Sequence, residues 1–398
     1  MTPVAKLSTL PKRNFTYIVL GLGGLGSAAA YWLARRAGAE VLGLEQFALG
    51  HDKGGSHDHS RIIRLSYHTP YYVELAKAAY QAWAEVEADA GERLILKTGG
   101  LDLFPAGGAI PMKDYTGSLQ AAGVLFELLD AAETMRRWPQ WRLPDDVQVL
   151  YQAESGIAPA NACTATHRRL ARAHGATLID NAPISQIQLS NHYYTITAGG
   201  QIYTAEKLII TAGAWSNHLL AHFGVKLPLT VTQEQLTYFA TPHFNEFAPQ
   251  HFPIWIWMDE PCFYGFPAYG ERAVKGAQDV GGREVTVETR TFEPDETAYN
   301  RLANFFAKYL PRAHAPALYT KTCLYTLTPD RDFIIDALPE HPNAFYAIGA
   351  AHDFKFSSVI GRILSELAID GATASDLTPF KITRPVLWME NPPKSFMV

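Results

Sequence analysis

Cys323 is the residue of this chain best placed for covalent chemistry. It is the third residue of the segment Lys-Thr-Cys-Leu-Tyr-Thr, which spans residues 321–326. A basic neighbour lowers the pKa of a thiol and so increases the fraction present as the nucleophilic thiolate. Because Lys321 stands two positions earlier, we expect Cys323 to be reactive toward an electrophilic ring held nearby. The alternative is a small buried side chain, which is the usual role of a free cysteine.

A glycine motif near the start of the chain predicts a nucleotide site. Residues 21–26 read Gly-Leu-Gly-Gly-Leu-Gly, after an apolar strand at 15–20 and before a helix at 27–36. A second apolar strand at 41–44 ends in Glu45, which is placed to accept hydrogen bonds from a ribose. The residues expected at the pyrophosphate are Gly21, Gly23, Gly24, Leu25 and Gly26, where helix amides face the phosphates. The alternative is a glycine-rich turn that binds nothing.

The motif alone does not separate NAD from FAD, but the far end of the chain favours FAD. Residues 333–336 and 344–349 read as strands, and a helix follows at 357–367. A C-terminal segment that returns to the N-terminal fold is what a long, two-ended FAD site requires. The uncharged stretch 15–34 is long enough to suggest a membrane span, but it breaks into glycines after its strand.

Composition narrows the function classes further. A chain of 398 residues favours two domains, and a net charge of −5 without any basic run argues against nucleic acid as a partner. Three scattered cysteines argue against a disulfide framework and for a reducing compartment. Residues 1–14 have no apolar signal core, and 395–398 carry no recognisable targeting signal. We therefore expect a cytoplasmic protein that is not attached to a membrane.

The middle of the chain predicts the domain organisation. Residues 71–87 read as an amphipathic helix, 193–204 as a hairpin, and 207–211 as a separate buried strand. Aromatic-rich strands over 227–287 indicate an inserted sheet domain, in which Trp255 and Trp257 are expected in the core. The predicted fold is α/β, with a Rossmann-like FAD-binding domain and a second α+β substrate domain on a mainly antiparallel sheet. We assign 1–90, 145–225 and 320–398 to the first domain and 91–144 and 226–319 to the second.

With these pieces in place, nearly the whole chain resembles the monomeric sarcosine oxidase family, flavoprotein amine oxidases that include N-methyltryptophan oxidase. The resemblance rests on the glycine motif and on five further segments. These segments are 55–64 (Gly-Ser-His-Asp-His-Ser-Arg-Ile-Ile-Arg), 212–215 (Ala-Gly-Ala-Trp), 264–267 (Tyr-Gly-Phe-Pro), 321–326, and 354–358 (Phe-Lys-Phe-Ser-Ser).

The resemblance implies a role for each matching residue. Cys323 would carry FAD through a thioether at the 8α position, and Arg64 and Lys355 would hold a substrate carboxylate. Lys275, eleven residues after Tyr264, would lie over the flavin where O2 reacts. The other expected pocket residues are Tyr264, Tyr325 and Asp279, and the other expected flavin contacts are His57, Arg61, Ile184, Gly213, Trp215, Ala351, Phe354 and Lys355.

Each charged residue also has a plainer interpretation. Arg64 could be a surface charge, but Ile62 and Ile63 beside it suggest burial, and a buried arginine needs an anion. Lys355, between two phenylalanines, could be solvated, and Lys275 could simply face water from its strand. Wherever O2 is reduced, its first electron makes an anion. A cation about 4 Å away, at an effective dielectric near 20, would stabilise that anion by roughly 4 kcal/mol, about a thousandfold in rate.

Four departures from the family pattern bear on the pocket, and one of them is a tryptophan-rich strand before Tyr264 that is unlike the strand associated with sarcosine specificity. The segment 55–61 is one residue shorter than in sarcosine oxidases, and the loop 349–353 is shorter and lacks two glycines. Asp279 stands where a histidine is common, so we expect a change in the charge of the pocket.

Taken together, the residues and the resemblance favour a monomeric oxidase of a secondary or N-alkyl amino acid that passes a hydride to FAD and electrons to O2, releasing H2O2. Two alternatives remain: a dehydrogenase with another electron acceptor, and a flavin-binding module without turnover.

Overall fold

The computed structural model describes residues 12–190 and 192–393. The expected absence of targeting signals concerned residues 1–14 and 395–398. The first segment lies mostly outside the described residues, and the second lies wholly outside them. Within the described residues, no helix combines the length and the apolar character that crossing a bilayer requires. The expected uncharged stretch near the N-terminus is a buried strand, β1 (Asn14–Leu20), followed by helix α1 (Gly24–Ala37).

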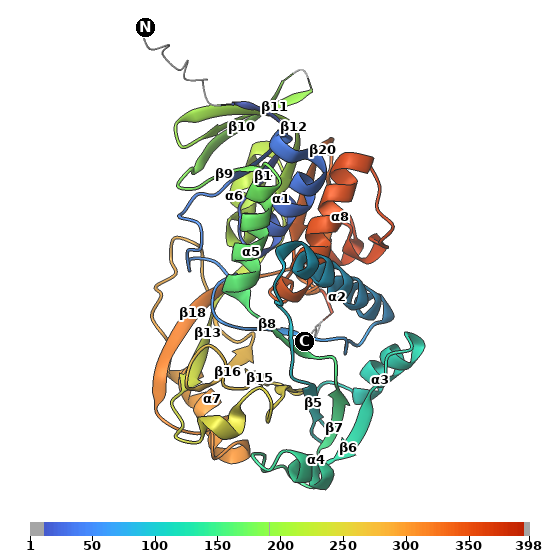
Figure 1. The fold of residues 1–398 in the computed structure, drawn as a ribbon, viewed down its shortest axis with the longest axis vertical. Coiled ribbons are helices and arrows are strands. Elements are labelled where there is room, and N and C mark those ends of the chain that lie inside the picture. Colours follow the sequence, from blue (N-terminus) through green and yellow to red (C-terminus); the bar gives the residue numbers. More distant parts are fainter. Residues whose placement is uncertain (1–11, 191, 394–398) are drawn as a thin grey trace, which may run out of the picture.

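The nucleotide-binding half is built on an eight-stranded sheet (Figure 1). Parallel pairing joins β1 to β2 (Val41–Leu44) and β12 (Gln201–Ile210), and β2 to β9 (Thr177–Ile179). The other edge of β12 is shared between an antiparallel meander and the C-terminal strands. These strands are β10 (Ile184–Ser190), β11 (Tyr193–Ala198), β19 (Ile334–Leu338) and β20 (His341–Ile348).

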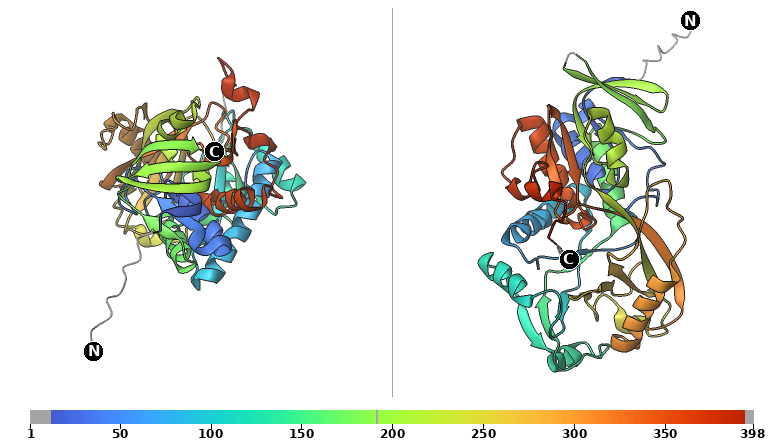
Figure 2. Two further views of the ribbon diagram at one scale, coloured as in Figure 1. Left: turned by 90° about the horizontal axis from the view of Figure 1, so that it is seen from above. Right: turned by 180° about the vertical axis from the view of Figure 1, so that it is seen from behind.

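Helices close one side of this sheet and supply most of its core. Helix α1 packs on α5 (Ala160–Ala173) and on the C-terminal helix α8 (Ser357–Asp370), and α8 also contacts α2 (Pro70–Ala90). Figure 2 shows from two further directions that the red C-terminal helix lies beside the blue N-terminal one. The predicted return of the chain's end to the nucleotide fold is therefore confirmed.

The second half is a nine-stranded, mainly antiparallel sheet with the order β17-β13-β16-β15-β14-β5-β7-β6, and β18 also pairs with β13. Its strands are β5 (Gly100–Phe104), β6 (Glu127–Asp130), β7 (Gln148–Gln152), β13 (Thr230–Phe239), β14 (Ile254–Trp257), β15 (Cys262–Phe266), β16 (Val274–Asp279), β17 (Arg283–Glu284) and β18 (Ala317–Leu327). The peripheral helices are α3 (Met112–Ala121), α4 (Ala131–Arg137) and α7 (Glu296–Tyr309). A small sheet of β3 (Arg61–Ile63), β8 (Gly156–Ala158) and β4 (Leu96–Lys97) lies apart from both. The predicted fold class, a Rossmann-like FAD-binding domain with a second domain on a mainly antiparallel sheet, is confirmed.

The two faces of the nine-stranded sheet have different roles. Side chains alternate along a strand, and directly paired residues share a face. On one face, Trp255 and Trp257 pack against Phe305 of α7 in an apolar core, as expected for both tryptophans. The opposite face carries the chemistry, because the register aligns Asp102, Ile256, Tyr264 and Ala277 in one row across four strands.

The same alternation fixes the neighbours of that row. Lys275 and Asp279 lie two residues either side of Ala277 on β16, so they share its face. Leu236 pairs with both Ala277 and Lys321, which puts Cys323 and Tyr325 of β18 on this face as well. One sheet face thus gathers side chains from four separate parts of the sequence.

The sheets differ from the expected organisation in two respects. Strand β7 and most of β18 fall in segments assigned by sequence to the FAD-binding domain, but they pair within the nine-stranded sheet. Residues 201–211, expected as a hairpin strand followed by a separate strand, are almost entirely the single strand β12. That strand is long because one end pairs in the meander and the other in the parallel sheet, a distinction that local sequence does not encode.

Candidate active site

A cavity of about 560 Å³ opens where β1 and β2 end at the glycine motif. Gly21 adopts a φ of +91°, which favours glycine, and its carbonyl turns toward Gly26. A Cβ on Gly26 would lie 1.8 Å from that carbonyl oxygen, so only glycine allows strand and helix to approach this closely. Gly21, Gly23, Gly24 and Leu25 line the cavity, as expected, whereas Gly26 supports the turn from behind.

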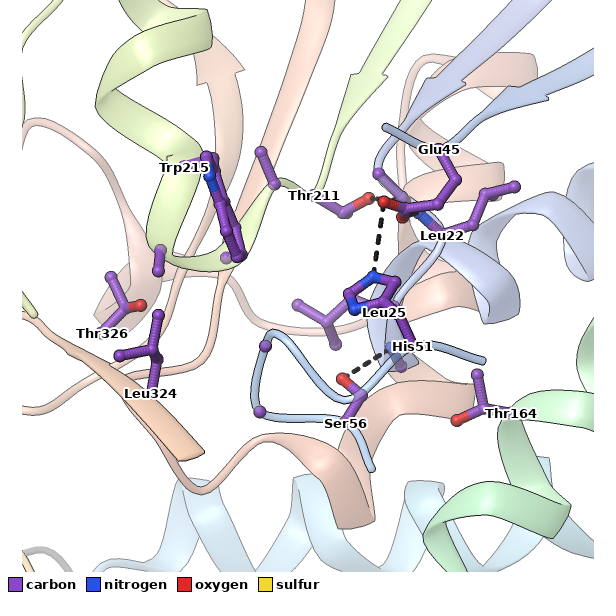
Figure 3. Close-up of a pocket in the computed structure, with 18 of the residues that line it drawn as sticks. Leu22, Leu25, Glu45, His51, Ser56, Thr164, Thr211, Trp215, Leu324 and Thr326 are labelled. Carbon is purple, nitrogen blue, oxygen red and sulfur yellow. Dashed lines mark hydrogen bonds and ion pairs between the residues drawn. The ribbon is translucent and has the colours of Figure 1, made fainter. Parts of the chain in front are cut away.

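The residues around this cavity fit an adenine dinucleotide. Backbone amides at the start of α1 face it, and Glu45 is fixed at the end of β2 by the amide of Leu22 at 2.8 Å and by His51 at 3.4 Å. In Figure 3, Trp215 and Thr326 lie on one side of the pocket, opposite Glu45 and Leu22. The chain thus supplies a helix N-terminus for phosphates and a carboxylate at the position expected for a ribose.

Most of the expected flavin contacts lie at this cavity. Arg61, Ile184, Gly213, Trp215, Ala351 and Phe354 line it together with Glu45. His57 and Cys323 do not; both are buried just behind its wall. Neither nitrogen of His57 has a hydrogen-bond partner among the described residues, and burial lowers the pKa of His57 to about 4. His57 is therefore a neutral, buried residue that does not line the cavity.

A second, smaller cavity lies beside the first. Arg61, Tyr325, Ala351 and Phe354 line both, so they mark the junction. The small cavity is lined further by Ile62, Arg64, Ile256, Tyr264, Phe266, Asp279, His352 and Lys355. The hydroxyl oxygens of Tyr264 and Tyr325 lie 3.3 Å apart. Every residue predicted to contact the substrate, with the exception of Lys275, is thus brought to one small, partly apolar cavity.

Arg64 already has an anion inside the protein. Its Nη1 lies 3.1 Å from Oδ1 of Asp102, and both side chains are buried. Burial alone would lower the pKa of Arg64, but Asp102 together with Tyr67 and Tyr115 raises that pKa. Nε and Nη2 of Arg64 have no hydrogen-bond partner among the described residues. Part of the arginine fork therefore remains available to a ligand.

Lys355, in contrast to Arg64, has no anionic partner within ion-pair distance among the described residues. It is buried, and its Nζ makes no hydrogen bond or ion pair with any described residue; its nearest described ring partners are Tyr67 at 5.7 Å and Phe356 at 5.8 Å. Burial, reinforced by Arg64, lowers the pKa of Lys355 to about 7. A lysine held this way is stabilised by any anion that enters the small cavity.

Lys275 lies behind both cavities rather than in their walls. Its Nζ contacts Oδ2 of Asp58 at 2.6 Å and the carbonyl and hydroxyl of Ser60 at 2.9 and 3.1 Å. Burial lowers the pKa of Lys275, and Asp58 opposes that shift. The charge of Lys275 is therefore largely balanced by Asp58. The plainer interpretation of a strand lysine facing water is wrong, because the side chain is only 2% exposed.

The expectation that Lys321 activates Cys323 is wrong. Cys323 is buried, and burial raises its pKa to about 11; Arg61 is the main cation opposing that shift. Lys321 is exposed and lies near the Tyr319 ring. The reason is that the free energy needed to remove a thiolate from water is larger than the free energy gained from its attraction to distant cations. The cations that favour the thiolate of Cys323 are Arg61, Lys275 and Arg290.

The shortened loop before Lys355 keeps a backbone shape that normally calls for glycine. Ala350 and Ala351 have φ values of +45° and +81°, in the left-handed region. This costs an alanine roughly 1–2 kcal/mol relative to ordinary backbone. The loop adopts this conformation without glycine at either position, and it brings Ala351 to the wall of both cavities.

Three charged residues at or beside the site were not identified from the sequence as functional: Asp58, Asp102 and Arg331. Asp58 lies inside the segment 55–64, where functional roles were assigned to its neighbours His57 and Arg61 but not to Asp58 itself. Asp102 alternates with leucines in β5, and a carboxylate in such a strand is a signal that could have been used. Arg331 pairs with Asp279 at 3.0 Å, a contact that no local pattern reveals.

Proteins of known family resemble this chain in sequence and in structure. A family model described as FAD dependent oxidoreductase matches residues 16–367. The chain is 31% identical to a monomeric sarcosine oxidase of Bacillus sp. (strain NS-129), over 95% of this chain and 98% of that protein. It is also 31% identical to an N-methyl-L-tryptophan oxidase of Salmonella heidelberg, over 93% and 99%. Among solved structures, the open form of NikD, an unusual amino acid oxidase, superposes with a TM-score of 0.82 at 25% identity, over 93% and 98%.

The chain belongs to the FAD-dependent oxidoreductases and, within them, to the family of monomeric sarcosine oxidase and N-methyltryptophan oxidase. The resemblance inferred from the sequence motifs is thereby confirmed.

Proposed function

We propose that this protein is an FAD-dependent oxidase of a secondary or N-alkyl amino acid. One observation carries the proposal. Lys355, a buried cation without an ion-pair partner among the described residues, and the unpaired edge of Arg64 line a small cavity that shares four lining residues with the dinucleotide cavity. An amino-acid carboxylate held there would place the neighbouring C–H and nitrogen at the junction. The comparisons support this class of enzyme, since the relatives are named as oxidases of such compounds.

The chain's own residues would bind, orient and desolvate the substrate. Lys355 offers a point charge and Arg64 offers two N–H donors, so together they fix a carboxylate in position and direction. Ile62, Ile256 and Phe266 exclude water, which strengthens those contacts. When bound, FAD supplies the two-electron acceptor for the C–H bond next to nitrogen. The product is an imine that water hydrolyses.

Finer features belong to the same proposal. Cys323 would hold FAD covalently, since it shares a strand face with Tyr325 and its three following residues line the large cavity. Lys275 would promote the reaction with O2, giving H2O2. We further propose a monomer in the cytoplasm whose partners are an amino acid and O2.

The reaction class is tested by incubating the holoenzyme with secondary amino acids in air. The proposal predicts O2 consumption matched by an equal amount of H2O2. Turnover only with an added dye or quinone would show a dehydrogenase instead. No turnover with any acceptor would indicate a binding module.

The low pKa of Lys355 predicts how carboxylate binding depends on pH. Lys355 is charged below its pKa of about 7 and neutral above it. Binding of acetate, followed through the visible spectrum of the bound flavin, should therefore weaken as pH rises through about 7. Lys355→Met should bind acetate about thirtyfold or more weakly at pH 6, because one partner of a desolvated charge contact is lost. The variant should also lose the pH dependence; retention of it would assign the titration to another group.

A further inference from the structure

Arg331 holds an unusual backbone conformation at the edge of the small cavity. It lies in the loop between β18 and β19, with a φ of +62° in the left-handed region. That region is uncommon for residues other than glycine and is retained only where the surroundings enforce it. The side chain is nevertheless directed inward, with 13% of it exposed.

Two groups of contacts fix this loop. Arg384 binds both carboxylate oxygens of Asp330, at 2.6 and 2.8 Å, and also the carbonyl of Asp332. From the cavity side, Nε2 of His352 lies 3.1 Å from the carbonyl oxygen of Arg331. Burial lowers the pKa of His352, so the ring is neutral and donates this bond. The position of Arg331 is therefore set from both sides.

The guanidinium of Arg331 is directed onto Asp279. Nη1 and Nη2 lie 3.0 and 3.5 Å from the two carboxylate oxygens, and only 10% of the Asp279 side chain is exposed. Asp279 lines the small cavity together with Lys355. The two oppositely charged side chains, Asp279 and Lys355, thus face one cavity without being paired to each other.

Most of the charged side chains that line the small cavity have a partner of opposite charge. Arg64 is paired with Asp102, and Asp279 is paired with Arg331. Arg61 lies 3.9 Å from Asp58, but Asp58 is also the closer partner of Lys275, at 2.6 Å. Among the described residues that line the cavity, Lys355 is the cation left without a carboxylate partner. If Arg331 were absent, Asp279 would be an uncompensated anion facing the same small space.

We propose that Arg331 is a positioning residue that keeps Asp279 occupied, so that Lys355 stays available to the carboxylate of the substrate. The inference rests on the proposed function. It also locates the substrate carboxylate: among the described residues that line the small cavity, Lys355 is the cation without a carboxylate within ion-pair distance, so the carboxylate of the substrate binds beside it.

The test measures acetate binding to the flavin-loaded protein at pH 6, below the pKa of Lys355, through the flavin's visible spectrum. Arg331→Gln should weaken acetate binding about thirtyfold, since an unpaired Asp279 then competes for Lys355. The double variant Arg331→Gln with Asp279→Asn removes that competitor and should return affinity to within about threefold of the unmodified protein. A purely structural role of Arg331 would give no such rescue.

Arg331→Asn is the second variant, because asparagine tolerates the left-handed conformation while lacking the charge. It should show the same loss and the same rescue by Asp279→Asn, with flavin content unchanged. Unaltered acetate affinity in both single variants, or a loss that the second substitution leaves in place, would overturn the role of Arg331. Neither outcome affects flavin reduction by amino acids in the unmodified protein, which tests the proposed function separately.

Discussion

Replacing Cys323 with serine should release the flavin from the chain. If Cys323 forms the proposed thioether, acid-precipitated protein stays yellow, whereas Cys323→Ser yields a colourless pellet and a yellow supernatant, or binds no flavin. Serine is nearly isosteric but cannot supply the sulfur. The change is all-or-none, which makes it the largest effect expected for this protein.

Cys163 offers a matched control for that experiment. It is also buried and free, but it lies in α5 rather than on the site's sheet face. Cys163→Ser should keep its flavin bound after precipitation. A colourless pellet from the yellow unmodified protein would show that the cofactor is held without a covalent bond.

Replacing Lys275 with methionine should slow the reaction of reduced flavin with O2 by about a hundredfold or more. A lone cation would provide roughly 4 kcal/mol at about 4 Å, near a thousandfold in rate. The Asp58 pair reduces that benefit, so the lower part of the range is expected. Anaerobic reduction by substrate should change much less, because Lys275 does not line the small cavity. Stopped-flow measurement of each half-reaction separates the two effects.

Removal of Lys275 also leaves Asp58 without its closest partner, and this needs its own control. The double variant Lys275→Met with Asp58→Asn eliminates both charges and should reoxidise faster than Lys275→Met alone. Equal slowing of both half-reactions would mean that Lys275 supports the pocket as a whole. If reoxidation is unaffected, Arg61 at the cavity junction is the next cation to test.

The sequence predicted those parts of the site that depend on local pattern. The glycine motif, its two strands and Glu45 were placed correctly because close backbone packing leaves few alternatives to glycine. Alternation along β16 is also local, and it puts Lys275 and Asp279 on one face.

Contacts between distant parts of the chain could not be predicted in the same way. Asp102 on β5 meets Arg64, which follows β3, although these two strands belong to different sheets. Arg331 reaches Asp279 from a loop that lies 52 residues further along the chain. The pKa of Cys323 was misjudged for a related reason, since burial is a property of the whole fold and overrides a neighbouring charge.

Anaerobic reduction of the bound flavin by matched compounds tests the central claim most directly. Secondary and N-methyl amino acids should bleach the flavin's visible band. Their decarboxylated counterparts, at the same subsaturating concentration, should react about thirtyfold or more slowly, because they cannot use Lys355 and Arg64. Bleaching of the flavin at equal rates by acids and decarboxylated amines, or no bleaching by any of them, would contradict the account.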